Sequence, residues 1–249
     1  MSRNTSVSPI VLFAYARPEH TRQTLEALEA NELAPESELF VFVDGARDES
    51  DKKYVSAVCG IAQSYQGFSK VTVVQRPQNY GLARNIIEGV TEIIEDHGRV
   101  IVLEDDVVTS PCFLTFMNLA LDHYADDTRV WHVSGWNYPI DLEDLPQAFF
   151  WRVMNCWGWA TWRRAWAQNS RLETWTDHEI RDVLRKISPG NRLFEAHWLR
   201  KLKAVKEGRL DTWDYQWQFA IWANEMLCIV PTEQQATNIG FGPRATHTT

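Results

Sequence analysis

The sequence predicts an α/β protein built on a mainly parallel β-sheet that is flanked by helices. Short, unbroken apolar runs recur through the first hundred residues, and segments with helical spacing of apolar residues separate them. An unbroken apolar run is typical of a parallel strand buried on both faces. Strands that alternate with helices at this spacing form βαβ units, so we expect the strands to lie parallel.

Strands and helices alternate in order from residue 10 onward. The strands are predicted at 10–15, 39–43, 71–75 and 100–103. The first helix begins at Pro18, because proline suits the first helical turn, and ends near Pro35. Apolar residues at helical spacing predict a second helix over 54–61 and a third over 86–94, with Gly98 as the stop of the third.

After residue 130 the regular alternation stops. Further strands are expected at 130–133 and 227–230, helices at 180–187, 193–207 and 216–223, a polar loop at 141–146, a dense aromatic segment at 151–166, and a Gly-punctuated loop at 238–248. There is no internal repeat and no linker rich in proline or serine. We therefore expect residues 1–249 to form one domain, with a first half over about 9–130 and a second half over about 131–249.

Composition excludes several classes of protein. The chain has 249 residues, a formal net charge of −8, 45% hydrophobic and 23% charged residues, as in a globular protein. The acidic balance argues against nucleic-acid binding, which needs a surplus of Lys and Arg. No apolar run approaches the ~20 residues of a membrane helix. The four cysteines form no CxxC pair, so we expect free thiols and a reducing cytoplasm.

Tryptophan is unusually frequent. The chain has 12, concentrated after residue 130, including the cluster Trp157, Trp159 and Trp162. Two interpretations stay open for these side chains. They can fill the core, or they can form flat apolar walls on which a sugar ring stacks.

Three polar segments directly follow predicted strands. These are Ala16-Arg17, Asp44-Gly45 and the acidic run Glu104-Asp105-Asp106. Ligands of open parallel sheets bind at the carboxyl ends of the strands. Adjacent carboxylates repel one another, and a hard divalent cation such as Mg²⁺ or Mn²⁺ would relieve that repulsion. A solvated turn or a helix cap is the alternative interpretation.

These segments resemble those of a known class of enzymes. The run over 102–106 resembles the metal-binding acidic motif of glycosyltransferases with the GT-A fold, in the Glu-Asp-Asp form that also occurs in N-acetylglucosaminyltransferase I. Segments 9–18 and 79–85 are similar to the first strand and the Asn-x-Gly-x-x-x-Asn stretch of family 2-like members. Segments 158–166 and 213–217 are similar to their Arg-Arg aromatic and Glu-Asp-x-Asp segments, but Trp213 replaces the usual acidic residue. The resemblance spans about 9–231.

The resemblance implies a Rossmann-like GT-A fold and a metal-dependent, inverting transfer from a nucleotide sugar. The first half would bind the nucleotide sugar, and the second half would supply the acceptor side and the catalytic base. Mn²⁺ or Mg²⁺ is expected at Asp106, with His247 of the C-terminal tail as a further candidate ligand. The residues expected to contact the donor are Ala16, Arg17, Asp44, Arg84, Glu104 and Asp105. For the two arginines, a solvated surface position is an equal alternative.

Inverting transfer needs a general base on the acceptor side. The resemblance assigns this role to Asp214, with Asp211 as a nearby rival and a buried structural aspartate as the alternative interpretation. Asp211 is placed on the acceptor side together with Trp157 and Trp159.

The substrates are expected by the same resemblance. The donor would be a UDP-sugar that carries a hexose or an N-acetylhexosamine, and the acceptor a glycan or a lipid-linked saccharide in surface polysaccharide synthesis. The Gln-x-x-Arg-Trp motif of processive synthases is absent from the sequence, which favours addition of a single sugar. The enzyme would work in the cytoplasm at the inner face of the membrane. There the basic helix over 200–206 is a candidate membrane contact, with a solvated helix face as the alternative.

Two other functions are weighed against this one. A non-catalytic carbohydrate-binding or scaffold domain would also explain the abundant tryptophan and the Trp213 substitution. A sugar-phosphate nucleotidyltransferase also has a parallel sheet and acidic metal sites. It is disfavoured because no Gly-rich triphosphate loop with a basic residue follows the first strand.

Overall fold

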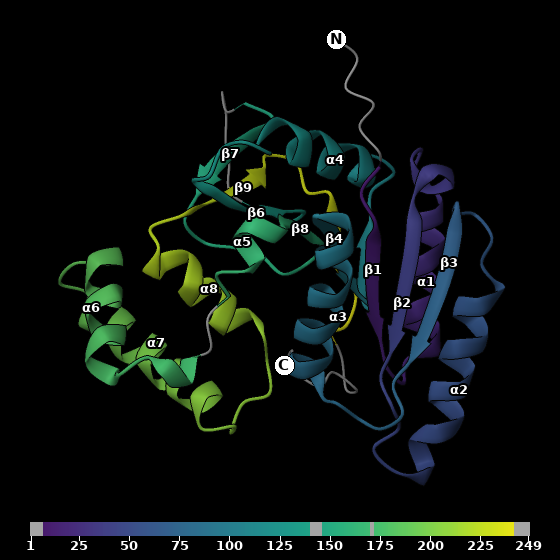
Figure 1. Cartoon of the computed structure of the whole chain (residues 1–249), viewed down its shortest axis with the longest axis horizontal. Helices are drawn as coiled ribbons and strands as arrows, with labels where there is room; N and C mark the ends of the chain where they lie inside the picture. The colour runs from purple at the N-terminus through teal and green to yellow at the C-terminus, as the bar shows by residue number, and fades with distance from the viewer. Residues whose placement is uncertain (1–6, 140–145, 170–171, 242–249) are drawn as a thin grey trace.

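A computed structural model describes residues 7–139, 146–169 and 172–241 of the chain (Figure 1). Its centre is an eight-stranded sheet in the order β3-β2-β1-β4-β8-β6-β9-β7. The first four of these strands are parallel to one another, and both parallel and antiparallel pairs follow. The mainly parallel α/β sheet with flanking helices that the sequence predicts is therefore confirmed.

The parallel part of the sheet comes from the first hundred residues. It consists of β1 (Ile10–Ala14), β2 (Glu38–Val43), β3 (Lys70–Gln75) and β4 (Arg99–Glu104). Every residue of β1 is buried, as expected for a strand covered on both faces. All four strands lie within a residue or two of their predicted positions. Unbroken apolar runs mark β1, β2 and β4, whereas β3 is a valine-rich segment interrupted by Thr72.

Helices α1 (Pro18–Glu29), α2 (Glu49–Ser64) and α3 (Leu82–His97) connect these strands. Gly98 ends α3 in the left-handed conformation, with φ of 77°, and its N–H donates to the Ile94 carbonyl at 2.8 Å. The predicted stop is thus confirmed. The first helix ends earlier than expected, and a short 3-10 helix, η1 (Ala34–Glu36), contains Pro35.

Alternate residues of β1 pack against different helices. Leu12 and Ala14 share an apolar cluster with Leu25 of α1 and Val55 of α2. Their neighbours Val11 and Phe13 belong to a second cluster, which contains Ile86 and Val90 of α3. The helices therefore cover both faces of the parallel strands, and burial of each large aliphatic side chain contributes ~1.5–3 kcal/mol.

The second half extends the same sheet. The strands expected at 130–133 and 227–230 are confirmed as β6 (Val130–Ser134) and β9 (Leu227–Pro231). The elements that were not predicted are β5 (Val107–Thr109), α4 (Phe113–His123), β7 (Ala148–Trp151), β8 (Trp159–Trp162), α5 (Arg163–Trp166), η2 (Leu172–Thr174) and β10 (Ala236–Asn238). Strand β8 pairs antiparallel with both β4 and β6 and so joins the two halves of the sheet. The loop expected at 141–146 lies outside the described residues except for Pro146.

The three remaining predicted helices are also confirmed. They are α6 (Asp177–Ile187), α7 (Arg192–Lys206) and α8 (Asp214–Ala223), which lie together to one side of the sheet (Figure 1). Their facing side chains form a third apolar cluster, with Ile180, Leu202 and Trp222 at its centre. Among the described residues, no helix is long and apolar enough to cross a membrane.

Candidate active site

The predicted strand-end residues meet at one edge of the sheet. Strand β1 lies between β2 and β4, with Ala14 opposite Val43 and Phe13 opposite Glu104. Because all three strands run in the same direction, their carboxyl ends carry Arg17, Asp44 and the acidic run into the same region. The parallel register thus brings polar residues from three separate loops to one edge of the sheet.

Arg17 forms ion pairs with two carboxylates of the acidic run. Its Nη2 lies 2.8 Å from Asp105 Oδ1 and its Nη1 lies 3.0 Å from Asp106 Oδ2. The N–H of Tyr15 donates to the other oxygen of Asp105 at 3.2 Å, and half-buried Ala16 lies between these two donors along the chain. Both aspartates are more than nine-tenths buried. The loop after β1 therefore neutralises two carboxylates that follow β4.

Burial and mutual repulsion perturb the acidic run. Burial, together with the charges of Asp106, Asp214 and Asp105, raises the pKa of Glu104 to about 8. Burial likewise raises the pKa of Asp105 to about 6, although the Arg17 charge opposes the shift. Adjacent carboxylates with raised pKa values favour a cation or a proton at this position.

Asp214 lies beside the acidic run, at the first residue of α8. Its charge contributes to the raised pKa of Glu104. The preceding residue, Trp213, is buried, and its indole N–H is 3.5 Å from Glu104 Oε1, a long hydrogen bond. The N–H of Tyr215 and the hydroxyl of Thr212 both donate to Asp214 Oδ1. Helix α8 thus brings Asp214, the residue predicted as the base, next to the acidic run.

Asp44 and Asp211 bind backbone N–H groups. The Asp44 carboxylate accepts hydrogen bonds from the N–H groups of Gly45, Tyr80 and Gly81 and from the Asn79 side chain, at 2.8–3.1 Å. It therefore holds the loop before α3 against the end of β2.

Asp211 caps the beginning of α3 from far along the chain. Its two carboxylate oxygens accept from the N–H groups of Leu82 and Ala83 at 2.8 and 3.0 Å. Gly81 precedes this helix with φ of 79°, and a Cβ there would lie 2.5 Å from Asp211 Oδ2. Only glycine tolerates both the backbone conformation and the close approach. Both oxygens of Asp211 are thus engaged in a structural contact.

Arg84 pairs with a neighbour on its own helix. Its Nε donates to Glu88 on the same helix at 2.7 Å, and its guanidinium lies 3.8 Å from the centre of the Tyr80 ring. About half of the side chain is exposed. Arg84 therefore lies next to the loop that Asp44 holds, with part of its guanidinium open to solvent.

The C-terminal strand covers Asp106. Strand β10 pairs antiparallel with β5, directly after the acidic run. The N–H of Ile239 donates to the Asp106 carbonyl at 2.8 Å, and a Cβ on Gly240 would lie 2.1 Å from Asp106 Oδ2. Residues 236–238 therefore form a strand that pairs beside the acidic run. The sequence predicts a loop from residue 238 onward, so Asn238 differs from that prediction. His247 lies outside the described residues.

The two tryptophans expected on the acceptor side differ in exposure. Trp159 is fully buried and stacks on Trp213 at 4.7 Å and on His132 at 5.4 Å, so its ring has no face open to a sugar. The expectation that Trp159 faces the acceptor is therefore wrong. Trp159 is buried because it lies in β8, an inner strand of the sheet. Trp157 is half-buried and contacts Trp136 at 4.6 Å and the exposed Phe241 at 5.7 Å. Phe241 follows Gly240, so this aromatic group borders Asp106.

The sequence does not predict the contacts that Trp213, Gly240 and Trp136 make at the site. Trp213 replaces the acidic residue of the family pattern, and its indole N–H donates to Glu104. Gly240 and Trp136 were given no role at the site. A glycine in a loop often allows another group to approach closely, so Gly240 was the sequence signal for the contact with Asp106. No local sequence pattern indicates that Trp213 contacts Glu104.

The residues of the acidic run fit a divalent cation that arrives with a phosphate ligand. Within the described ranges, no three His, Cys, Asp or Glu side chains form a preformed metal centre. Mg²⁺ sites commonly use only one or two carboxylates together with substrate phosphates. Asp106 offers a carboxylate among repelling neighbours, with Arg17 as the cation already bound to it. Asp106 would hold such a cation.

The fold defines the class of this protein as the GT-A fold of glycosyltransferases. The sequence profile of the GNT-I family matches residues 1–175, so the chain belongs to the GNT-I family. No curated protein matches the sequence.

Two solved structures are similar to this chain at low sequence identity. The chain is similar to residues 1–349 of S. aureus TarS, with a TM-score of 0.51 and 12% identity over 92% of this chain and 59% of that one. It is also similar to the mannosyltransferase PcManGT from Pyrobaculum calidifontis, with a TM-score of 0.47 and 11% identity over 98% and 62% of the two chains. The chain thus spans about six-tenths of the length of each.

Proposed function

We propose that the chain is a divalent-metal-dependent, inverting glycosyltransferase that moves one sugar from a nucleotide sugar to an acceptor hydroxyl. One observation carries this proposal. The acidic run after β4 and the first turn of α8 lie in contact through Trp213 and Glu104, which are 109 residues apart in sequence. A leaving-group site and a base candidate are therefore adjacent. Membership of the GNT-I family supports the same reaction class.

The donor would bind at the carboxyl edge of β1, β2 and β4. A divalent cation at Asp106 would neutralise the negative charge that grows on the leaving diphosphate. Arg17 would exchange its contact with Asp106 for the phosphate oxygens, since a guanidinium binds both anions with the same geometry. Asp44 would fix the loop over 79–81 that faces the nucleotide, through the hydrogen bonds described above.

Asp214 would act as the general base. The acceptor oxygen forms a bond to the anomeric carbon, the bond from that carbon to the diphosphate oxygen breaks, and the acceptor proton passes to the carboxylate. Both hydrogen bonds described for Asp214 go to Oδ1. Oδ2 is therefore the oxygen proposed to take the proton.

The acceptor would lie against the partly exposed aromatic group. Trp136, Trp157 and Phe241 offer ring faces and edges beside Asp106, and sugars stack on such surfaces. Asp211 would act on this side only by holding the first turn of α3. We further propose that both halves work as one unit, since β8 from the second half pairs with β4 from the first.

The proposed substrates are a UDP-linked hexose or N-acetylhexosamine and a glycan or lipid-linked acceptor of surface polysaccharide. The proposed location is the cytoplasmic face of a membrane, where a lipid-linked acceptor would be within reach.

The test is release of free sugar and nucleoside diphosphate from a panel of nucleotide sugars, with Mn²⁺ and without acceptor. One donor is expected to be hydrolysed slowly, and Asp106→Asn is expected to abolish the reaction. Loss of every hydrolysis signal, together with oligosaccharide binding, would replace the proposal with the scaffold function. Pyrophosphate release from a nucleoside triphosphate and a sugar phosphate would replace it with nucleotidyl transfer.

A further inference from the structure

The hairpin of α6 and α7 is basic although the chain is acidic. Residues 177–209 contain nine Lys and Arg against five Asp and Glu, a formal charge of +4 in a chain whose total is −8. The rest of the chain therefore carries −12. Such segregation concentrates a positive field on one face of the molecule.

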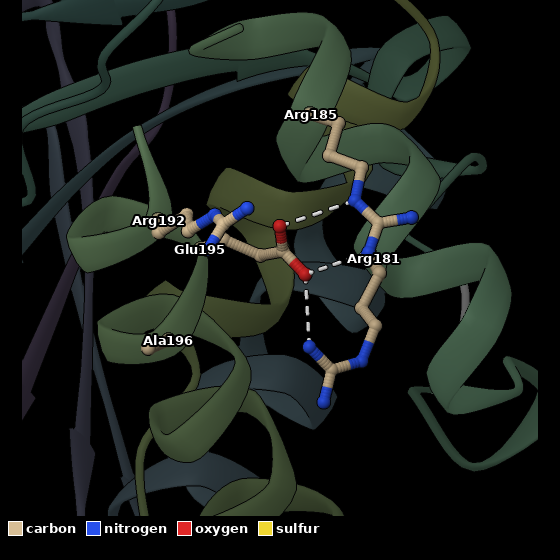
Figure 2. Close-up of a pocket in the computed structure, with 5 residues that line it drawn as sticks. All are labelled: Arg181, Arg185, Arg192, Glu195 and Ala196. Carbon is tan, nitrogen blue, oxygen red and sulfur yellow. Dashed lines mark hydrogen bonds and ion pairs between the residues drawn. The ribbon is translucent and has the colours of Figure 1, made fainter. Parts of the chain in front are cut away.

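Three arginines of this hairpin line a pocket of about 330 Å³ (Figure 2). Arg181 and Arg185 project from α6, and Arg192 and Glu195 come from the beginning of α7. Arg181 Nη1 lies 2.8 Å from Glu195 Oε1, while Arg185 binds both oxygens of Glu195 at 3.1 Å. The single carboxylate in the lining thus joins the two helices.

Positive charge remains after these contacts. Each guanidinium has five N–H donors, and only some of those on Arg181 and Arg185 reach Glu195. Asp182 lies 3.5 Å from Arg185 Nη1, which is a weak contact. Arg192 is exposed, and within the described part of the chain its side chain has no hydrogen bond or ion pair. It is also the first residue of a 15-residue helix, where the helix dipole favours an anion.

We propose that Arg181, Arg185 and Arg192 form a binding site for a phosphate group. Paired arginine forks match the oxygens of a phosphate monoester or diester. The phosphate has two possible sources, a soluble phosphate or the headgroup of an anionic lipid. The site is separate from the acidic run and goes beyond the proposed function.

Leu193 favours the lipid headgroup as the source. It directly follows Arg192, and 85% of its side chain is exposed. An exposed leucine beside basic side chains is typical of a surface that inserts an apolar group between lipids while the charges bind headgroups.

Glu195 would be the internal competitor of the phosphate. Its carboxylate occupies donors that a phosphate oxygen would otherwise accept. Glu195→Gln should therefore strengthen phosphate binding several-fold, whereas a merely structural carboxylate would yield no such gain. Arg192→Gln should weaken binding about tenfold, the usual effect of a lost charge-assisted hydrogen bond. Lys52→Gln on α2 removes the same charge far along the chain from the hairpin and should change binding by less than about twofold.

The experiment measures the full chain and its variants at low salt, by calorimetric titration with inorganic phosphate and by sedimentation with vesicles. The vesicles are phosphatidylcholine alone or mixed with phosphatidylglycerol, and circular dichroism checks that each variant is folded. Binding of phosphate and of the anionic vesicles, both weakened by Arg192→Gln, assigns the site to a lipid headgroup. Binding of phosphate alone assigns it to a soluble phosphate.

The proposal is overturned if neither probe binds, or if Arg192→Gln and Glu195→Gln behave like Lys52→Gln. The experiment measures phosphate and vesicle binding and does not measure sugar transfer. Its result therefore does not depend on whether the proposed glycosyltransferase function is correct.

Discussion

Arg17 and Asp106 form an ion pair at 3.0 Å across the carboxyl edge of the sheet, between the loop after β1 and the acidic run after β4. The same guanidinium reaches Asp105 at 2.8 Å. A protein cation therefore occupies the carboxylate that is expected to hold a metal. A ligand that brings a divalent cation and a diphosphate offers a new partner to each group of this pair.

Replacement of Arg17 by glutamine should destabilise the fold and free the site for metal. Two largely buried aspartates would lose their counterion, and the free energy of unfolding should fall by about 2 kcal/mol. Mn²⁺ should recover much of that loss, because the freed carboxylates can bind it. The measurement is urea unfolding with and without Mn²⁺. Arg22→Gln, an exposed arginine on α1, is the matched control. Equal Mn²⁺ effects in the two variants would contradict the counterion role.

The raised pKa of Glu104 predicts a pH dependence of stability. Between pH 4.5 and about 8 the folded chain keeps the Glu104 proton that the unfolded chain has released. The unfolded state then binds fewer protons, so the free energy of unfolding falls as pH rises through this window. Over these roughly 3.5 pH units, at about 1.4 kcal/mol per unit, we expect a loss on the order of 5 kcal/mol.

Urea unfolding of Glu104→Gln across the same pH range checks this expectation. The glutamine keeps the shape and has no proton to lose, so its profile should be flatter than that of the wild type. Parallel profiles for the two proteins would show that the pH dependence has another origin.

Substitutions of Asp211 and Asp214 should have different effects on stability and on turnover, which distinguishes the structural residue from the base. Asp211→Ala removes the cap of α3 and should cost about 1 kcal/mol of unfolding free energy. Asp214→Asn should lower transfer by about 10²–10⁴-fold while the affinity for the donor nucleotide is unchanged. Turnover and calorimetric nucleotide titration on both variants give the answer. If Asp211→Ala stopped turnover without loss of stability, Asp211 would be the base.

Gly240→Ala should impair the site without unfolding the sheet. The added Cβ would lie 2.1 Å from Asp106 Oδ2, so either the carboxylate or the last strand must move. We expect at least a tenfold loss of metal-dependent nucleotide affinity, or about 1.4 kcal/mol. Gly60→Ala in α2 meets no atom within 4 Å and should be neutral or stabilising. Equal nucleotide affinities in the two variants would remove Gly240 from the site.

The first half of the fold is predictable because its signals are local. Strands β1 and β4 are unbroken apolar runs, and α3 has a regular apolar stripe that ends at Gly98. Strand β8 is different. Its four residues are all buried and two are tryptophans, so no alternation of polar and apolar residues marks it as a strand. Pairing with β4 and β6, far apart in sequence, decides its structure.

The candidate site is predictable only in part, for a similar reason. Position after a strand and likeness to a family motif indicate Asp106 and Asp214 as candidates. The engagement of Asp211 with backbone N–H groups 128 and 129 residues away depends on tertiary structure. The burial of Trp159 under Trp213 is likewise a long-range packing result, so composition alone cannot distinguish a sugar platform from core.

The central claim is that the acidic run binds a nucleotide diphosphate through a divalent cation. The most direct measurement is a thermal-shift titration with nucleoside diphosphates and their sugars, with and without Mn²⁺, on the wild type, Asp106→Asn and Asp214→Asn. One nucleotide should stabilise the wild type by about 2.7 kcal/mol at a hundredfold excess over its dissociation constant. The effect should require Mn²⁺, vanish in Asp106→Asn and persist in Asp214→Asn. No stabilisation by any nucleotide, or an equal stabilisation of Asp106→Asn, would contradict the claim.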